Sequence, residues 1–377
     1  MKKYAICLSA LLATHFALAQ TLPTPDHIVI MWDENRNYTE IVGNPLAPYI
    51  NSLIGDSHTA LFTDYYALIS GSQPNYLMLF SGSTQGVSGS TITSVQFTDC
   101  NLGASLIAGG YTFIGYSDSL PSVGFLGTTS GNYARKHNPW SNWQGTGTNQ
   151  LPPATNVPFT AFPHDFDSLP TVSFVVPDLL DDMHTPSDAT AILPGDTWFK
   201  NNLDPYIQWA KTHNSLMIFG FDESSDTFEH ILYLFIGQSV VGGSYGEYTN
   251  NYRTLRTIEQ MYHLPYCGNS DTATAITSVF TGVPSGVAAT TTGESKITVF
   301  PVPATDALHI RISGTFTGSN EVSLTDQLGT ILRKESIYIT PGQNELELST
   351  AGLASGIYFI KVAGENINYL SKVIVAH

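Results

Sequence analysis

Residues 27–35 read His-Ile-Val-Ile-Met-Trp-Asp-Glu-Asn, an apolar run that ends in two acids and an amide. The run lacks the alternation of apolar and polar side chains that marks a strand with one exposed face. Strands buried on both faces read this way, because helices cover both sides of their sheet. Three more runs of this kind follow, at residues 111–116, 172–176 and 216–221. The pattern predicts an α/β domain in which helices enclose a buried sheet.

Acidic and amide residues directly follow three of these runs. They are Asp33, Glu34 and Asn35 after the first, Asp178, Asp181, Asp182 and His184 after the third, and Asp222 and Glu223 after the last. In open α/β sheets, ligands bind beyond the carboxyl ends of the strands. Carboxylates that meet there repel one another unless a cation neutralises them, so the pattern suggests a bound metal ion. Ordinary solvated loop acids are the alternative for any single pair.

The composition excludes several classes of protein. The chain has 377 residues, of which 42% are hydrophobic and 11% aromatic, which is too apolar for a disordered chain. A formal net charge of −16 argues against a nucleic-acid binder that works through basic patches. Beyond the N-terminus the sequence contains no apolar run of the ~20 residues that a membrane span needs.

The first 19 residues have the features of a signal peptide. Lys2 and Lys3 precede an apolar stretch, and Ala17-Leu18-Ala19 before Gln20 fits the small-x-small cleavage rule. The mature chain is therefore expected to function outside the cytoplasm. It keeps two cysteines, Cys100 and Cys267, which either form one disulfide in that compartment or stay as thiols, because the sequence does not place their Cα atoms.

The composition and apolar periodicity of the sequence change near residue 285. Residues 286–293 read GVAATTTG, a linker composition without apolar periodicity. Short alternating runs separated by turn residues follow, which predicts a small β-sandwich. We therefore divide the chain into a signal peptide (1–19), the α/β domain (20–284), a linker (285–296) and a sandwich (297–377).

Two serines are candidate nucleophiles. Ser72 precedes Gln-Pro-Asn-Tyr, where a helix can begin, but its hydroxyl needs a base or a metal ion to become reactive, and a polar helix cap is the alternative. Ser244 lies in a Gly-x-Ser-x-Gly pattern like that of lipases and esterases, which requires an acid and then a histidine downstream. Here His263 precedes the last acid of the domain, Asp271, and no helix begins directly after the pattern, so we interpret this segment as a glycine loop.

Taken in order, five short motifs resemble the secreted phosphoesterase family, which includes bacterial acid phosphatases and phospholipases C of the alkaline-phosphatase-like superfamily. The motifs are Glu34-Asn35, SQPNY at 72–76, RKHNP at 135–139, PDLLDDMH at 177–184 and FDE at 221–223. The resemblance covers roughly residues 24–270 and includes a closing helix within 252–265. It implies an alkaline-phosphatase-like α/β/α sandwich with a mostly parallel sheet.

The resemblance also assigns roles to residues. The implied ligands of a divalent metal ion (zinc, calcium or magnesium) are Glu34, Asn35, Ser72, Asp222 and Glu223. Ser72 is the implied nucleophile, and the implied phosphate-contacting or proton-transferring residues are His137, His184 and His230. Two positions depart from the family pattern, since Asn251 stands where many members have His and Asp178 where many have Asn. These departures put the metal count and the protonation of the leaving group in doubt.

The C-terminal region resembles the type A sorting domain of type IX secretion substrates. The similar segments are VFPVPATD at 299–306, LASGIYFIKV at 353–362 and SKVIV at 371–375, with Val302 where that family usually has Asn. The resemblance implies export through the periplasm to the cell surface or the medium, by the type IX machinery. A carbohydrate-binding sandwich is the alternative, although this region has no Trp to stack on a sugar.

These observations predict a secreted, metal-dependent phosphoesterase that acts on a phosphate ester through a phosphoserine intermediate. A phospholipase C-type phosphodiesterase or a sulfatase on the same fold is the nearest alternative. A non-catalytic surface binding protein is the alternative from a different class. The residues do not separate monoester, diester and phospholipid substrates.

Overall fold

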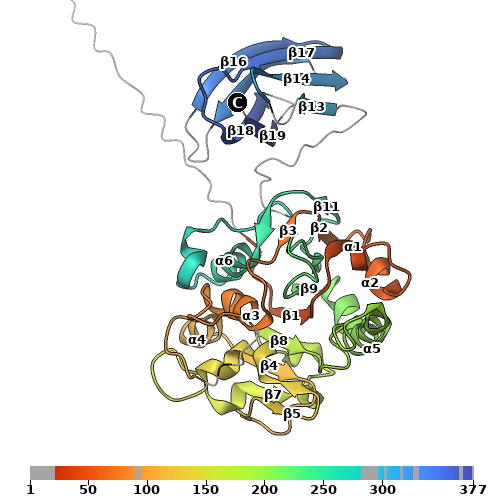
Figure 1. The fold of residues 1–377 in the computed structure, drawn as a ribbon, viewed down its shortest axis with the longest axis vertical. Helices are drawn as coiled ribbons and strands as arrows, with labels where there is room; N and C mark the ends of the chain where they lie inside the picture. Colours follow the sequence, from red (N-terminus) through yellow and green to blue (C-terminus); the bar gives the residue numbers. More distant parts are fainter. Residues whose placement is uncertain are drawn as a thin grey trace, which may run out of the picture. The chain divides into compact units, whose positions relative to one another are not determined.

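The computed structural model describes residues 22–89, 93, 95–281, 296–300, 304–314, 317–325, 331–364 and 368–375. The chain divides into two compact units, Met1–Pro284 and Ser285–His377 (Figure 1). The expected signal peptide and residues 285–295 of the expected linker lie outside the described residues. Lys296, at the end of that linker, begins a strand.

An eight-stranded sheet forms the centre of the first unit. Across the sheet the strands are β11 (Gly243–Tyr245), β2 (Thr59–Phe62), β10 (Tyr233–Ile236), β9 (Ser215–Phe221), β1 (His27–Asp33), β8 (Val172–Val176), β4 (Phe113–Ser117) and β7 (Asn156–Pro158). Neighbouring strands run parallel, except that β10 is antiparallel to β2 and β9. The mostly parallel α/β sheet expected from the sequence is thus confirmed.

Helices cover both faces of this sheet, with α3, α4 and α6 on one side and α2 and α5 on the other (Figure 1). The α-helices are α1 (Tyr38–Ile41), α2 (Pro48–Leu53), α3 (Ser72–Ser81), α4 (Leu102–Ala108), α5 (Ile192–Ala210) and α6 (Asn251–Met261). Every residue of β8 and β9 is buried, which explains why their sequences do not alternate. Helix α6 is the closing helix expected from the resemblance.

Short elements complete the first unit. They are strands β3 (Tyr65–Tyr66), β5 (Thr129–Ser130), β6 (Tyr133–Ala134) and β12 (Thr249–Asn250), and 3₁₀ helices η1 (Arg135–His137), η2 (Pro139–Trp143), η3 (Pro153–Thr155), η4 (Phe159–Ala161), η5 (Phe166–Ser168), η6 (Ala189–Ala191) and η7 (Gly268–Thr272). Ser244 is exposed in the edge strand β11 and not in a loop, and α6 begins only at residue 251. The segment therefore lacks the strand-to-helix turn of a nucleophile elbow.

A disulfide joins Cys100 and Cys267, which settles the question that the sequence left open. It connects the segment before α4 to the segment after α6, across 167 residues of chain. Such a cross-link stabilises a fold chiefly by restricting the unfolded chain.

The second unit consists of two antiparallel sheets. One contains β13 (Lys296–Phe300), β14 (Ala307–Gly314) and β17 (Gly342–Ser349); the other contains β16 (Ile331–Ile339), β15 (Gly318–Thr325), β18 (Gly356–Gly364) and β19 (Asn368–Val375). Leu308 and Ile310 from the first sheet share a buried core with Val322 and Ile360 from the second. This is the small β-sandwich that the alternating runs predicted. Among the described residues of both units, no helix combines the length and apolar character needed to cross a bilayer.

Candidate active site

The turns after three neighbouring strands, β1, β8 and β9, meet at one edge of the sheet. The Glu34 N–H donates to the Asp182 carbonyl at 2.7 Å, and the Asp222 N–H donates to the Asp33 carbonyl at 3.1 Å. The Asn35 N–H donates to Asp222 Oδ1 at 3.1 Å, and a backbone φ of 41° at Asn35 turns the chain sharply there. Because the carboxyl ends of parallel strands share an edge, acids far apart in the sequence are brought together here.

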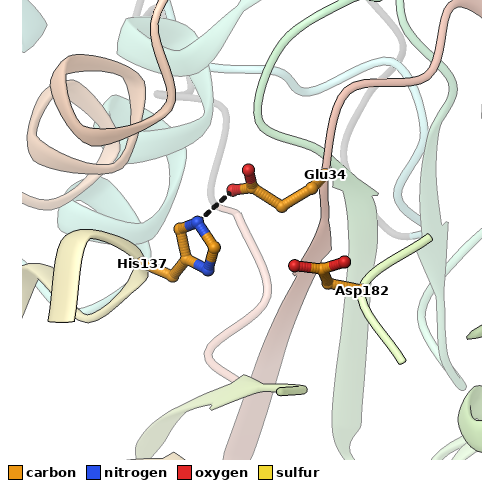
Figure 2. Close-up of side chains that lie close together, drawn as sticks. All are labelled: Glu34, His137 and Asp182. Atoms are coloured by element: carbon orange, nitrogen blue, oxygen red, sulfur yellow. Dashed lines mark ion pairs between the residues drawn. The ribbon is translucent and has the colours of Figure 1, made fainter. Parts of the chain in front are cut away.

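Glu34 lies at the centre of this group. His137 Nε2 is 2.8 Å from Glu34 Oε1 (Figure 2). Lys136 Nζ is 3.4 Å from Glu34 Oε2. Burial by itself would raise the pKa of Glu34, but His137 and Lys136 outweigh burial and hold that pKa below its usual value. Glu34 is therefore a buried carboxylate that remains ionised.

Ser72 is the first residue of α3, and its hydroxyl lies between two carboxylates. Its Oγ is 2.9 Å from Glu34 Oε2 and 3.1 Å from Glu223 Oε1, and it also accepts from Lys136 Nζ at 3.3 Å. The N–H of Gly71 donates to Glu223 Oε2, and the φ of 130° at Gly71 is one that side chains strongly disfavour. The turn before α3 thus places the hydroxyl where both acids reach it.

Three further buried aspartates at this edge have oxygens without a hydrogen-bond donor among the described residues. They are Asp222 and Asp182, each through Oδ2, and Asp33 through both oxygens. Burial and the charges of Glu34 and Glu223 raise the pKa of Asp222, while burial and Glu34 raise the pKa of Asp182 to about 6. Burial, followed by Asp182, raises the pKa of Asp33.

The carboxylates at this edge of the sheet fit a divalent cation. The carboxylates of Asp33, Glu34, Asp182, Asp222 and Glu223 are at most 4% exposed. The basic side chains in contact with Glu34 are those of Lys136 and His137. One ligand atom each from Glu34, His137 and Asp182 lies within 4.8 Å of the others (Figure 2). Oxygen atoms that lack donors, in a site with excess negative charge, are what a hard or borderline cation would satisfy.

The structure thus joins most of the expected ligand set. Glu34, Ser72 and Glu223 are in direct contact, and Asp222 is linked to the group through its bonds to the N–H groups of Asn35 and Glu223. The side chain of Asn35 is partly exposed beside them.

The expected histidines occupy three different settings. His137 contacts Glu34 and stacks on Tyr76, with ring centroids 5.4 Å apart. His184 is half-buried in the Asp182 turn, where its N–H donates to Asp182 Oδ1 at 2.9 Å and burial lowers the pKa of its ring. His230 instead stacks on Tyr38, and its Nε2 lies 3.1 Å from the Thr63 carbonyl. The structure therefore places His137 against Glu34, the carboxylate that accepts from the Ser72 hydroxyl. Among the described residues, His230 has no contact with Glu34 or Ser72.

The two residues that depart from the family pattern, Asn251 and Asp178, both form hydrogen bonds within the protein. Asn251 accepts from the Tyr65 hydroxyl at 3.0 Å and donates to Asn75 Oδ1 at 3.4 Å. Asn75 in turn donates to the Gly71 carbonyl at 3.2 Å, so Asn251 supports the turn before Ser72. Asp178 accepts from the Ser119 hydroxyl at 2.6 Å.

Lys136 is a site residue that the sequence motifs did not predict. It lies in η1 between Arg135 and His137. The RKHNP motif at 135–139 implied a role for His137 alone. The available signal was compositional, because a lysine beside a candidate site residue stands out in a chain with 15 basic and 31 acidic residues. The sequence also gave Asp182 no ligand role beyond its position after a strand.

Comparison with known proteins identifies the family. Residues 44–265 match the phosphoesterase family, and residues 298–376 match the secretion system C-terminal sorting domain. Over 265 residues the chain is 40% identical to phosphatidylinositol-3-phosphatase of Mycobacterium tuberculosis, an alignment that covers 70% of this chain and 85% of the relative. The chain therefore belongs to the phosphoesterase family, as its motifs predicted.

More distant relatives are also phosphatases. The chain is 25% identical to a probable acid phosphatase of Kluyveromyces lactis, across 64% of this chain and 59% of the relative's length. Among solved structures, a protein of the alkaline phosphatase superfamily from Vibrio parahaemolyticus is similar with a TM-score of 0.48 and 14% identity, covering 83% of this chain and 82% of that one.

The family and the sorting domain fix the general role. The protein is a hydrolase that acts on phosphoric ester bonds. The C-terminal sorting domain indicates a secreted or cell-surface protein and implies the type IX machinery as a partner.

Proposed function

We propose that this chain is an exported, metal-dependent phosphatase that hydrolyses phosphate monoesters through a phosphoserine on Ser72. The observation that carries the proposal is the Ser72 hydroxyl, held between Glu34 and Glu223 and touched by Lys136. The names of the relatives, phosphatidylinositol-3-phosphatase and acid phosphatase, favour a monoester over a diester or a sulfate ester.

The metal would be held by Glu34, Asn35, Ser72, Asp222 and Glu223, with Asp182 adjacent. When bound, it would supply Lewis acidity that lowers the pKa of the Ser72 hydroxyl and polarises a phosphoryl oxygen. Zinc, calcium and magnesium are all compatible with oxygen ligands and a nearby histidine.

In the first step, Ser72 Oγ forms a bond to phosphorus while the bond to the leaving oxygen breaks. Glu34 Oε2 already accepts from Lys136, and Glu34 Oε1 is in contact with His137, so Glu223 is proposed as the acceptor of the hydroxyl proton. Lys136 neutralises charge that develops on the phosphoryl oxygens, and the N-terminus of α3 faces the same group.

The leaving oxygen takes a proton from His184, the half-buried histidine at the end of the Asp182 turn. Water then attacks phosphorus and passes a proton to His184, while the bond between phosphorus and Ser72 Oγ breaks. Ser72 takes back its proton from Glu223, and inorganic phosphate leaves. His137 holds Glu34 in position through the 2.8 Å contact. We assign no catalytic role to His230, because its ring nitrogen is engaged with the Thr63 carbonyl.

A substrate panel tests this proposal. The full mature chain is assayed with an aryl phosphate, a bis-aryl phosphate, an aryl sulfate and a phospholipid, before and after chelation and with added metal. We expect the aryl phosphate to be hydrolysed fastest, in a metal-dependent way, and rapid quench to place labelled phosphate on Ser72. Faster cleavage of the diester or the sulfate would replace the monoesterase assignment, and full activity without metal would reject the metal-assisted step.

The export route is tested separately in a host with type IX secretion. Removal of residues 297–377 is expected to retain the enzyme in the periplasm, because the sandwich is the proposed export signal. Equal export with and without these residues would reject that role and favour a binding module.

A further inference from the structure

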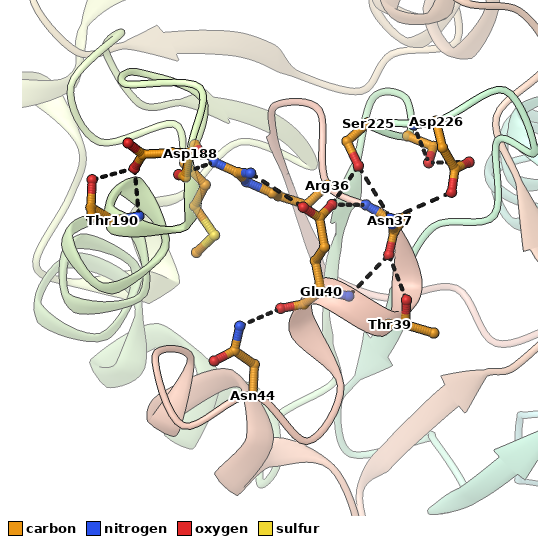
Figure 3. Close-up of polar contacts among 11 residues, drawn as sticks. Arg36, Asn37, Thr39, Glu40, Asn44, Asp188, Thr190, Ser225 and Asp226 are labelled. Atoms are coloured by element: carbon orange, nitrogen blue, oxygen red, sulfur yellow. Dashed lines mark hydrogen bonds and ion pairs between the residues drawn. The ribbon is translucent and has the colours of Figure 1, made fainter.

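A buried arginine lies directly behind the candidate site. Arg36 follows Glu34 by two residues and is 3% exposed. Its polar contacts are drawn in Figure 3. Its Nε and Nη2 donate to the Met183 carbonyl at 3.0 and 2.7 Å, and Nη2 also donates to the Asp188 carbonyl at 2.6 Å. Its Nη1 donates to Glu40 Oε1 at 3.4 Å. One guanidinium thus binds two main-chain carbonyls and a carboxylate.

The Met183 carbonyl belongs to the turn that carries two site residues. Met183 lies between Asp182 and His184, and its φ of 67° places it in the left-handed region that few such residues adopt. A backbone conformation of this kind persists only when surrounding contacts maintain it. Arg36 supplies two of those contacts, and it reaches them from the segment that contains Glu34.

The same network extends to the third site turn. Glu40 Oε2 accepts from the Asn37 N–H at 2.9 Å and from the Ser225 hydroxyl at 2.5 Å. Asn37 Nδ2 donates to Ser225 Oγ at 3.2 Å and to Asp226 Oδ2 at 3.4 Å (Figure 3). Ser225 and Asp226 follow Asp222 and Glu223 in the chain. We call Arg36, Asn37, Glu40, Ser225 and Asp226 the Arg36 network.

The Arg36 network counteracts the repulsion between buried carboxylates on three turns. Asp182, Asp222 and Glu34 are buried carboxylates on three different turns, and their like charges push those turns apart. Hydrogen bonds from one planar guanidinium hold two of the turns at a fixed spacing, and Glu40 with Ser225 holds the third. A lysine cannot replace this arrangement, because its single ammonium lacks the planar fork of donors.

We propose that Arg36 is a positioning residue that sets the spacing of the three carboxylate-bearing turns and thereby the affinity of the site for its metal ion. The inference rests on the proposed function, since it assumes that these turns hold a cation. Arg36 acts through Met183, Asp188 and Glu40, and none of its contacts in the described residues is with Ser72 or with an expected ligand side chain.

The test compares Arg36→Lys and Arg36→Gln with Arg256→Gln. Arg256 also donates to two loop carbonyls, those of Ser270 and Asp271, at 3.1 and 2.8 Å, but at η7 after the end of α6. Each metal-free full chain is titrated with Mn²⁺ and with Zn²⁺ by calorimetry, and its thermal unfolding, kcat and KM are measured with an aryl phosphate.

We expect both Arg36 variants to unfold cooperatively and to lose roughly 10- to 100-fold in metal affinity and in kcat, as support residues behind metal ligands do. KM should change little. Arg256→Gln should lower the melting temperature while leaving metal affinity and kcat within about twofold, because removal of carbonyl contacts far from the site affects stability alone.

If the Arg36 variants only lose stability, with metal affinity and kcat unchanged, the positioning role is wrong. If they do not fold, Ser225→Ala decides, since this exposed residue loosens only the outer part of the network. A weaker loss of metal affinity and kcat in Ser225→Ala supports the proposal, and no change overturns it. Absence of metal binding in the wild-type protein and in Arg256→Gln would instead reject the proposed function itself.

Discussion

Lys136 Nζ lies 3.3 Å from Ser72 Oγ and 3.4 Å from Glu34 Oε2. Burial alone would lower the pKa of Lys136, but the charges of Glu34 and Asp222 raise it above its usual value. The side chain is therefore a fixed positive charge beside the nucleophile, in a site whose other groups are mostly anionic. Charge placed in advance where a transition state develops negative charge is an effective form of electrostatic catalysis.

Replacement of Lys136 by Gln should lower kcat by roughly 10²- to 10³-fold, the cost of removing one well-placed stabilising group. Lys136→Arg should retain part of the rate because it keeps the charge. Steady-state kinetics with an aryl phosphate measure both. Lys211→Gln is the matched control, since Lys211 contacts Asp56 at 3.0 Å directly after the end of α5. Unchanged kcat in Lys136→Gln would show that this lysine is structural only.

Ser72→Ala should reduce turnover by about three orders of magnitude or more, because it removes the attacking oxygen. The fold should survive, since the helix that begins at Ser72 keeps its buried apolar residues. Ser244→Ala is the control and should be fully active, because Ser244 is exposed in β11. A high residual rate in Ser72→Ala would indicate that water attacks phosphorus directly.

Asp222→Asn should have opposite effects on stability and on metal binding. The metal-free variant should melt at a higher temperature, because one of several mutually repelling buried carboxylates becomes neutral. Its metal affinity and kcat should fall together, and excess metal should restore part of the rate. Calorimetry and thermal unfolding of chelated samples measure the two effects, with Asp167→Asn, an exposed residue in η5, as the control. A variant that is less stable without metal would contradict the idea that repulsion dominates there.

Glu259 should make stability depend on pH. It is fully buried in α6, accepts from the Cys267 N–H at 2.8 Å and from the Ser270 hydroxyl at 2.6 Å, and burial raises its pKa to about 7. The folded chain binds this proton more tightly than the unfolded chain, whose glutamate titrates near 4.5. Below pH 4.5 Glu259 is protonated in both states and does not lower the free energy of unfolding. As the pH rises from there to about 7, the free energy of unfolding falls.

Over that window the loss is on the order of 3 kcal/mol, since one pKa unit corresponds to ~1.4 kcal/mol. Glu259→Gln should remove this part of the pH dependence, although it should also lose one hydrogen bond at every pH. Denaturant unfolding at several values between pH 4.5 and 8 gives the difference between the two proteins as a function of pH. A constant difference across the range would mean that Glu259 does not titrate in this window.

The sequence by itself determined which segments form the sheet and which acids lie at its edge. Runs such as residues 216–221 had to be buried strands because they have no polar face, and Asp222 follows directly. In neighbouring parallel strands the carboxyl ends meet, so Glu34, Asp222 and Glu223 were predictable as a group. The motif around Ser72 identified the nucleophile candidate, and comparison with relatives confirmed the family that these motifs indicated.

The tertiary structure alone decided how the remaining side chains meet. His230 and His137 looked alike in the sequence, but one stacks on Tyr38 and the other contacts Glu34. Cys100 and Cys267 are bonded because the segments flanking α4 and α6 pass each other, which no local pattern records. Lys136 contacts Ser72 from a separate 3₁₀ helix, and Arg36 binds the Met183 carbonyl in the turn that carries Asp182. Periodicity and motifs report local burial and chemistry, whereas such contacts depend on the path of separate loops, which only the packing of the whole chain determines.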